Sequence, residues 1–258
     1  MIEPDLIASV AAITFGIGVI LGFIGAGGAG TMLAVLTIVF GLSIHEAVGT
    51  SLAAMVFVTV SGAISHYRET NVELRAGMLV GLTGMIGAIA GAELGQIVSG
   101  DVLQPLAGLA LWFLALLMWI RTRLHHHPSQ LSPDEDPLGS PSRKIGTVLL
   151  GLGGGTASAF FGVGMAPFLQ LGMLVILGLP LRITVGTTMM ALIFISLSGS
   201  AALASHGQVS VPHLIGATIG MTLGSYAGAK LTRRAPLRVL RAAIVLTPFI
   251  AGTLLIVT

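Results

Sequence analysis

Long apolar runs with at most one charged residue recur along this sequence, and they decide what the chain can fold into. A helix needs roughly 20 apolar residues to cross a hydrocarbon core of about 30 Å. Four runs reach that length: Leu6–Ile24, Ala47–Ser65, Ala76–Val98 and Val102–Ile120. Only 9% of the residues are charged, whereas a soluble domain carries about a quarter. The sequence therefore predicts an all-α polytopic membrane protein, with the lipid bilayer as its first partner.

Composition also argues against several classes of site. The chain has no cysteine, so disulfides and thiolate metal sites are excluded. The net charge of +2 gives no reason to expect nucleic acid as a partner. Three consecutive histidines, His125–His127, lack neighbours that would complete a coordination shell, and we expect neither metal nor cofactor. The acidic start, with Glu3 and Asp5, is unlike a signal peptide and predicts a retained first helix.

Two halves of the sequence match each other at a fixed offset of 137 residues, the separation of Gly25 and Gly162. Ordered blocks at one offset indicate a duplication. We predict an N-terminal transmembrane repeat over residues 1–123, a solvated cytoplasmic linker over 124–142 and a C-terminal repeat over 143–258. The matching blocks are Gly25–Gly27 with Gly162–Gly164, Gly41–Leu42 with Gly178–Leu179, Gly49–Ser51 with Gly186–Thr188, and Gly87–Leu94 with Gly224–Leu231.

Each half opens with an apolar stretch that glycines interrupt, at Gly25–Gly30 and at Gly162–Pro167. If each stretch were one helix, the two halves would run parallel. If each breaks into a pair, the halves are inverted and all twelve basic residues fall on one side, which is cytoplasmic by the positive-inside rule. We expect this second fold, in which each inverted repeat has a Gly-broken helix pair followed by three membrane-spanning helices. Both termini are then outside, with the acids Glu3, Asp5, Glu46, Glu93 and Asp101.

Inverted repeats with broken helices are an architecture of secondary transporters, which bind substrate where the breaks meet. The N–H groups at a restarted helix have no intrahelical partner and favour an anion. We therefore expect an anion site and alternating access, with no catalytic residues. The candidate ligands around the breaks and the following helix starts are Gly25, Gly27, Gly28, Thr50, Ser51, Gly162, Gly164, Pro167, Gln170, Thr187 and Thr188.

Structural alternatives exist for each of these residues. Glycine clusters also serve close helix packing, hydroxyls in apolar helices often bond back to their own helix, and Gln170 is either a ligand or an interhelical contact. No P-loop, nucleophile elbow or metalloprotease motif is present, so an enzyme is the weaker class. A membrane assembly or scaffold protein is the alternative function. Breaks matched between the halves argue against it, because a scaffold does not need them.

Several of these motifs together resemble the sulfite exporter TauE/SafE family. They are the first glycine-rich break, Gly41–Leu42, Ala47–Ser51, Gly162–Pro167 and Gly186–Thr188, and the resemblance covers essentially the whole chain apart from the linker. It implies an inner-membrane permease for sulfite, sulfoacetate or another organosulfonate, coupled to a gradient of an ion such as protons or sodium. One departure is Gly30, where the family pattern has a proline that the second half keeps as Pro167.

Overall fold

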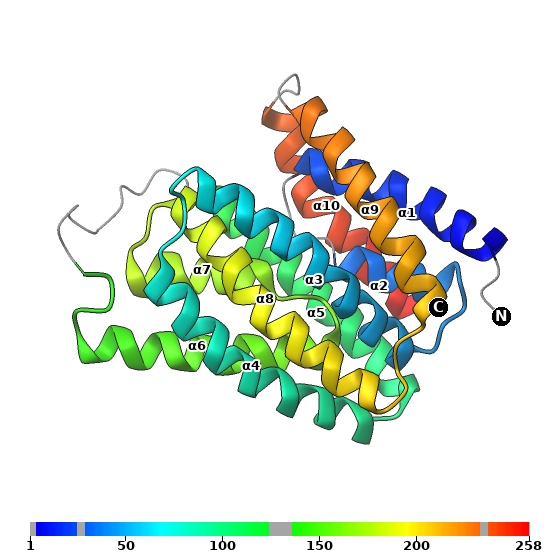
Figure 1. Ribbon diagram of the computed structural model, residues 1–258, viewed down its shortest axis with the longest axis horizontal. Coiled ribbons are helices and arrows are strands. Elements are labelled where there is room, and N and C mark those ends of the chain that lie inside the picture. Colours follow the sequence, from blue (N-terminus) through cyan, green and yellow to red (C-terminus); the bar gives the residue numbers. More distant parts are fainter. Residues whose placement is uncertain (1–3, 25–28, 124–135, 233–236, 258) are drawn as a thin grey trace.

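The computed structural model describes residues 4–24, 29–123, 136–232 and 237–257. Helices are the regular elements of these ranges, and most of them lie along the length of one elongated bundle (Figure 1). In chain order they are α1 (Pro4–Ile24), α2 (Ala29–Ile38), α3 (Ile44–Arg68), α4 (Leu74–Ile97), α5 (Gly100–Arg123), α6 (Pro141–Phe161), α7 (Ala166–Leu177), α8 (Leu181–Ser205), α9 (Val211–Thr232) and α10 (Leu237–Val257).

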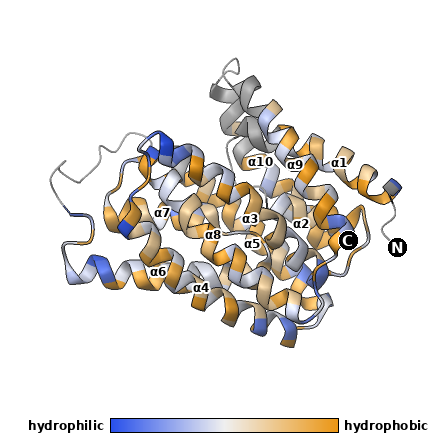
Figure 2. Ribbon diagram, in the orientation of Figure 1, coloured by the Kyte–Doolittle hydropathy of each residue, from blue (hydrophilic) through white to orange (hydrophobic). Residues whose placement is uncertain are grey.

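Four of the described helices, α3, α4, α5 and α8, are long and apolar enough to cross a membrane, and further apolar stretches lie in α1, α7 and α10. Hydrophilic residues gather toward the two ends of the molecule, and hydrophobic residues cover the helices between them (Figure 2). A bilayer excludes unpaired polar groups from such a middle zone and admits helices, which satisfy their own backbone. The expectation of a polytopic helical membrane protein is confirmed.

Two helices are too short to cross a bilayer alone. At a rise of 1.5 Å per residue, the 10 residues of α2 span about 15 Å and the 12 residues of α7 about 18 Å, roughly half of the hydrocarbon core. In Figure 1, α1 and α3 both begin toward the right of the molecule, whereas α6 and α8 both begin toward the left. Each short helix thus completes a pair that returns the chain to the end from which it came.

The central helices α3 and α8 lie antiparallel and are in contact. Gly49 near the start of α3 meets the backbone of Gln208, just beyond the end of α8, and Gly186 near the start of α8 meets the backbone of Asn71, just beyond the end of α3. In both places a Cβ would strike a backbone carbonyl. Only glycine permits this approach, and the two contacts fall on positions related by the 137-residue offset.

Glycine also sets the spacing of the outer helix pairs. α4 packs on α6, where the backbones at Leu152 and Thr156 lie directly against Gly87 and Gly91. α1 packs on α9 in the same manner, with Gly224 against the backbone of α1. Small residues let helix backbones approach closely in lipid, where dispersion must replace the hydrophobic drive. The packing interpretation is therefore correct for these glycines.

Candidate functional site

A buried break in the second half separates α6 from α7. Gly162 follows α6 with φ +69° and Gly164 follows with φ +71°, both in the left-handed region that favours glycine. α7 then begins at Ala166, with Pro167 in its first turn, a position where the missing proline N–H costs nothing. All residues from 162 to 167 are buried. The chain breaks where the glycine and proline pattern predicted.

The start of α7 leaves backbone donors without protein acceptors. The first backbone N–H of this helix that donates to a carbonyl is that of Leu169, which donates to Met165 O at 3.0 Å. No carbonyl or side chain among the described residues accepts the N–H groups of Gly164, Met165 and Ala166. A buried donor without a partner costs about 1–3 kcal/mol, and the helix dipole places positive potential at the same point. This helix end is suited to an anion.

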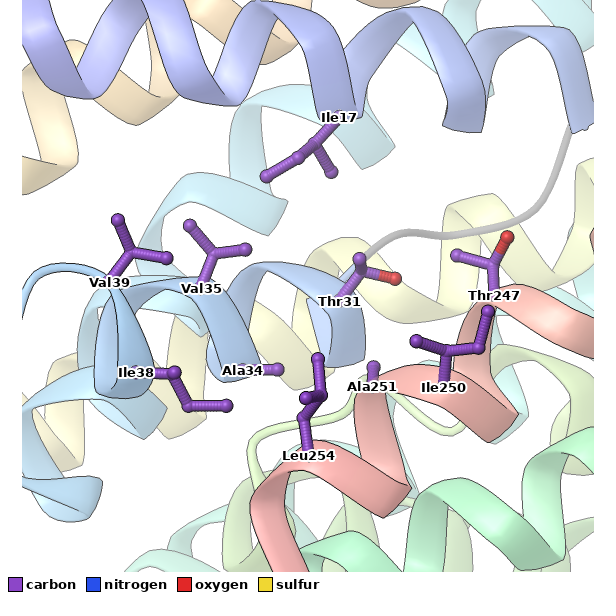
Figure 3. A pocket seen from close by; sticks show the side chains of 10 residues that line it. All are labelled: Ile17, Thr31, Ala34, Val35, Ile38, Val39, Thr247, Ile250, Ala251 and Leu254. Carbon is purple, nitrogen blue, oxygen red and sulfur yellow. The ribbon is translucent and has the colours of Figure 1, made fainter. Parts of the chain in front are cut away.

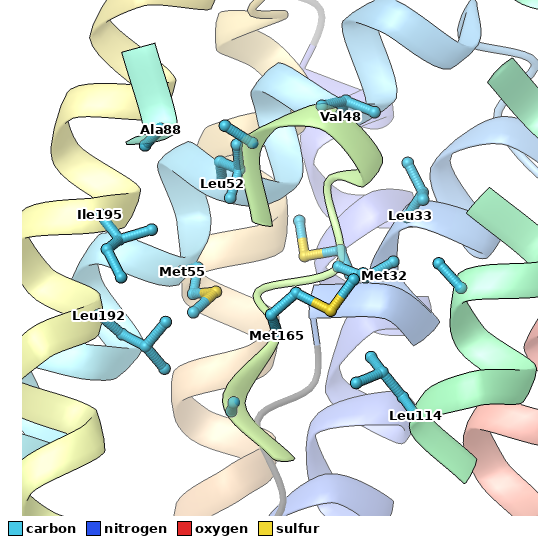
Figure 4. Packing of buried hydrophobic residues seen from close by; sticks show 14 of the residues in the cluster. Met32, Leu33, Val48, Leu52, Met55, Ala88, Leu114, Met165, Leu192 and Ile195 are labelled. Carbon is cyan, nitrogen blue, oxygen red and sulfur yellow. The ribbon is translucent and has the colours of Figure 1, made fainter. Parts of the chain in front are cut away.

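Helix α3 packs directly against the break. Ser51 Oγ donates to Val48 O at 2.9 Å within α3 and lies 3.1 Å from Gly162 O. A Cβ on Gly162 would come within 2.9 Å of Val48 Cα, so the approach requires glycine there. Met165, which is 3% exposed, belongs to the same apolar cluster as Met55 of α3 (Figure 4). The backbone of the break thus provides polar groups inside an otherwise apolar wall.

Two threonines from the predicted set form hydrogen bonds between the halves. Thr50 Oγ1 accepts the N–H of Ser210, the residue before α9, at 3.0 Å. Thr187 Oγ1 accepts the N–H of Glu73, the residue before α4, at 2.9 Å. Both threonines are fully buried, and within the described part of the chain neither hydroxyl donates a hydrogen bond. Each hydroxyl thus joins its own helix to a segment of the other half. The hydroxyl's own proton remains available to donate to a ligand.

The other predicted residues have different surroundings. Thr188 Oγ1 donates to Thr184 O at 2.8 Å and lies 3.7 Å from Met173 Sδ, which is the back-bonded arrangement usual in apolar helices. Gln170 is 3% exposed, one turn into α7. The candidates Gly25, Gly27 and Gly28 lie outside the described residues. The structure therefore gathers Ser51, Gly162, Gly164 and Pro167 at one break, while Thr50 and Thr187 lie near the starts of α3 and α8.

Sequence reasoning missed several polar residues in this region. Ser158, in the last turn of α6, is fully buried, and its hydroxyl has no partner among the described residues. Ser210 and Glu73, which bind the two threonines, lie 137 residues apart. The alignment of the two halves therefore placed Glu73 and Ser210 at equivalent positions. Their side chains differ, so the equivalence did not draw attention, because each contact uses only the backbone N–H.

A separate cavity of about 260 Å³ lies between α1, α2 and α10. Figure 3 shows that its labelled lining is aliphatic apart from Thr31 and Thr247. Among the described residues that line it, none is charged and none belongs to the predicted ligands. A cavity of this composition does not select an anion. The described residues of the lining are Ile17, Thr31, Ala34, Val35, Ile38, Val39, Thr247, Ile250, Ala251 and Leu254.

Comparison with known proteins agrees with this architecture. A family model described as "Sulfite exporter TauE/SafE" matches residues 10–255. The chain is 41% identical over 244 residues to "Probable membrane transporter protein YdhB" of Bacillus subtilis, covering 95% of this chain and 98% of that protein. It is 25% identical over 225 residues to a "Probable membrane transporter protein" of Xylella fastidiosa, covering 84% and 82%. No solved structure matches. The chain belongs to the sulfite exporter TauE/SafE family of membrane transporters.

Proposed function

We propose that this transporter is a secondary carrier of small sulfur-containing anions, such as sulfite, sulfoacetate or another organosulfonate. The observation that carries the proposal is the buried start of α7, where the N–H groups of Gly164, Met165 and Ala166 have no acceptor among the described residues. An oxyanion accepts several such donors at once and is favoured by the helix dipole. The family description supports sulfite and related anions as the class of substrate.

The binding site is formed by the break between α6 and α7, with Ser51 and Gln170 beside it and with Thr50 and Thr187 at the ends of the central helix pair. The first break contributes Gly25, Gly27 and Gly28 as its counterpart. No buried cation is needed, because backbone N–H groups and hydroxyls supply the donors. Neutral donors also suit a transporter, which must release its anion as well as bind it.

Alternating access arises from two inverted repeats that move against each other. The paired contacts of Thr50 with Ser210 and of Thr187 with Glu73 support this proposal, because the 137-residue offset exchanges one pair for the other. The opposite directions of α3 and α8 (Figure 1) also support it. If the Thr50–Ser210 hydrogen bond breaks while the Thr187–Glu73 hydrogen bond stays, one end of the molecule opens and the other stays closed. The reverse exchange opens the opposite end.

The sidedness follows from charge. Basic residues at the end where α6 begins include Arg75, Arg143 and Lys144, and Arg75 lies 3.6 Å from Asp136 of the linker. By the positive-inside rule this end is cytoplasmic, and both termini are outside the inner membrane. An inner membrane also supplies the proton or sodium gradient that a secondary carrier uses.

Anion flux into proteoliposomes that contain only this protein tests the function. The anions are sulfite, sulfate, thiosulfate, sulfoacetate and taurine, with a carboxylate control, each with and without a proton gradient. Saturable flux of one sulfur oxyanion or sulfonate above that of the carboxylate is the expected result. Absence of flux for the whole panel, from protein shown to be folded, would contradict the proposal.

A further inference from the structure

A histidine at the outer end of the molecule is joined to the Thr50 contact through one residue. The backbone N–H of Ser210 donates to Thr50 Oγ1 at 3.0 Å, and the hydroxyl of Ser210 lies 2.7 Å from His213 Nδ1. His213 is half-buried in the first turn of α9. A change in the charge of this ring therefore acts on a residue that already binds the proposed anion ligand.

The other end of the molecule has no such histidine at the equivalent place. Glu73 corresponds to Ser210 at the 137-residue offset, and Ala76 corresponds to His213. The Glu73 carboxylate accepts the N–H of Ala76 at 2.5 Å and closes the start of α4. The cytoplasmic contact with Thr187 thus ends on a helix-capping carboxylate, whereas the outer contact with Thr50 ends on an imidazole ring, which can bind and release a proton.

The His213 ring lies among an aromatic side chain and the start of α9. Phe40 makes an edge-to-face contact with it, with ring centroids 5.6 Å apart, and the hydroxyl of Ser210 lies 2.7 Å from Nδ1. Among the described titratable groups of α1 and α3, which pack on α9, Glu46 lies in the first turn of α3, Asp5 is exposed, and His66, Tyr67 and Arg68 lie in the last turn of α3, at its opposite end. His45 near the start of α3 bonds to the carbonyls of Gly95 and Val98, and His206 bonds to Glu93.

We propose that His213 binds the proton that is transported together with the anion. The inference rests on the proposed function and names its coupling residue. A protonated ring adds positive charge beside the Thr50 end of the anion path, so it favours anion binding. Thermodynamic linkage requires the converse, that a bound anion favours the proton by the same factor. Mutually favourable binding makes the state with both proton and anion the favoured loaded state. A carrier that changes sides in this state is a proton–anion symporter, with proton entry from the outer end.

Proton uptake per transported anion distinguishes this role from a structural one. The probe is sulfoacetate, which is fully ionised on both sides of the ordinary histidine pKa of about 6.5, in proteoliposomes that contain a trapped pH dye. In the unmodified protein we expect stoichiometric internal acidification, and a half-saturation concentration that rises about tenfold from the acidic to the alkaline side, within the usual range of coupling. In His213→Gln we expect loss of acidification per anion and a flat pH profile.

Two further variants complete the test. His206→Gln removes a histidine from the same end that bonds only to Glu93 among the described residues, and it should keep the proton stoichiometry. Ser210→Ala keeps the N–H that binds Thr50 and removes the link to His213, and it should lower the proton uptake even if His213→Gln does not fold. Flux without acidification in the unmodified protein, or normal proton uptake in folded His213→Gln, would overturn the inference and leave the proposed function intact. Absence of flux in the unmodified protein would overturn both.

Discussion

Buried hydroxyl side chains form two different kinds of hydrogen bond in this protein. Thr59 donates to Met55 O at 2.9 Å and Ser196 donates to Leu192 O at 2.6 Å, each four residues back in its own helix. Thr50 and Thr187 instead accept N–H groups from segments more than one hundred residues away. The first arrangement adds little to a helix that already bonds its own carbonyls. The second satisfies a donor that the helix cannot reach.

Replacing either cross-linked threonine should therefore impair transport more than replacing a back-bonded one. Thr50→Val and Thr187→Val keep the side-chain volume but leave the N–H of Ser210 or Glu73 unpaired, at a cost of about 1–3 kcal/mol. Because 1.4 kcal/mol is about tenfold in an equilibrium constant, we expect anion flux in proteoliposomes to fall about tenfold or more. Thr59→Val is the matched control on α3 and should keep its flux. Unchanged flux in both Thr50→Val and Thr187→Val would remove the hydroxyls from the site.

At the level of the elements, close backbone contact defines the helix pairs. α4 and α6 approach each other where Gly87 and Gly91 offer no Cβ, and α1 and α9 do the same at Gly224, the equivalent of Gly87. Other glycines have free space around them, and Gly153 on α6 has no atom within 4 Å of a built Cβ. Some of the many glycines are therefore required by a close helix contact, and others are not.

Alanine substitution separates these two kinds of glycine. Gly87→Ala places a methyl group against the carbonyl of Leu152 and forces α4 and α6 apart, which should cost about 1–3 kcal/mol as overpacking does. Gly153→Ala should lose nothing, since alanine is favoured over glycine within helices. Thermal unfolding of both purified variants in detergent measures the difference. Equal transition temperatures would show that the contact at Gly87 does not contribute to stability.

At the level of the whole molecule, the proposed topology places the two ends of the bundle on opposite sides of the membrane. Ser99, between α4 and α5, and Ser142, in the first turn of α6, are exposed. The proposed sidedness places Ser99 outside and Ser142 in the cytoplasm. Because the chain has no cysteine, a single introduced thiol reports its own side without background.

Labelling with a membrane-impermeant maleimide tests this sidedness. In intact cells we expect Ser99→Cys to be labelled and Ser142→Cys to stay unlabelled until the membrane is permeabilised. In inverted vesicles the pattern should reverse. Labelling of both positions from one side would contradict inverted repeats, because the two sites belong to opposite ends of the bundle. If Ser142→Cys were labelled in intact cells and Ser99→Cys only after permeabilisation, the orientation in the membrane would be the reverse of the proposed one, and the fold would stand.

Much of this protein could be read from its sequence, because the determining interactions are local. Apolar runs of membrane length must become helices, since no other open structure satisfies its backbone in lipid. The break at Gly162–Pro167 was predictable because positive φ at glycine and the missing N–H of proline are properties of those residues alone. The fixed offset also indicated the duplication before any contact was visible.

Only the tertiary structure decided which polar groups meet. A threonine in an apolar helix always has the carbonyl four residues back as an acceptor, so its sequence context is the same whether or not a distant N–H reaches it. The pairing of Thr50 with Ser210 spans 160 residues, and the link from Ser210 to His213 has consequences only after that pairing forms. The sequence by itself determined the helices and the break at Gly162–Pro167, because these depend on each residue's own backbone and hydropathy, and its fixed offset predicts the duplication. The hydrogen bonds of the candidate site were decided by how α3, α8 and α9 pack together.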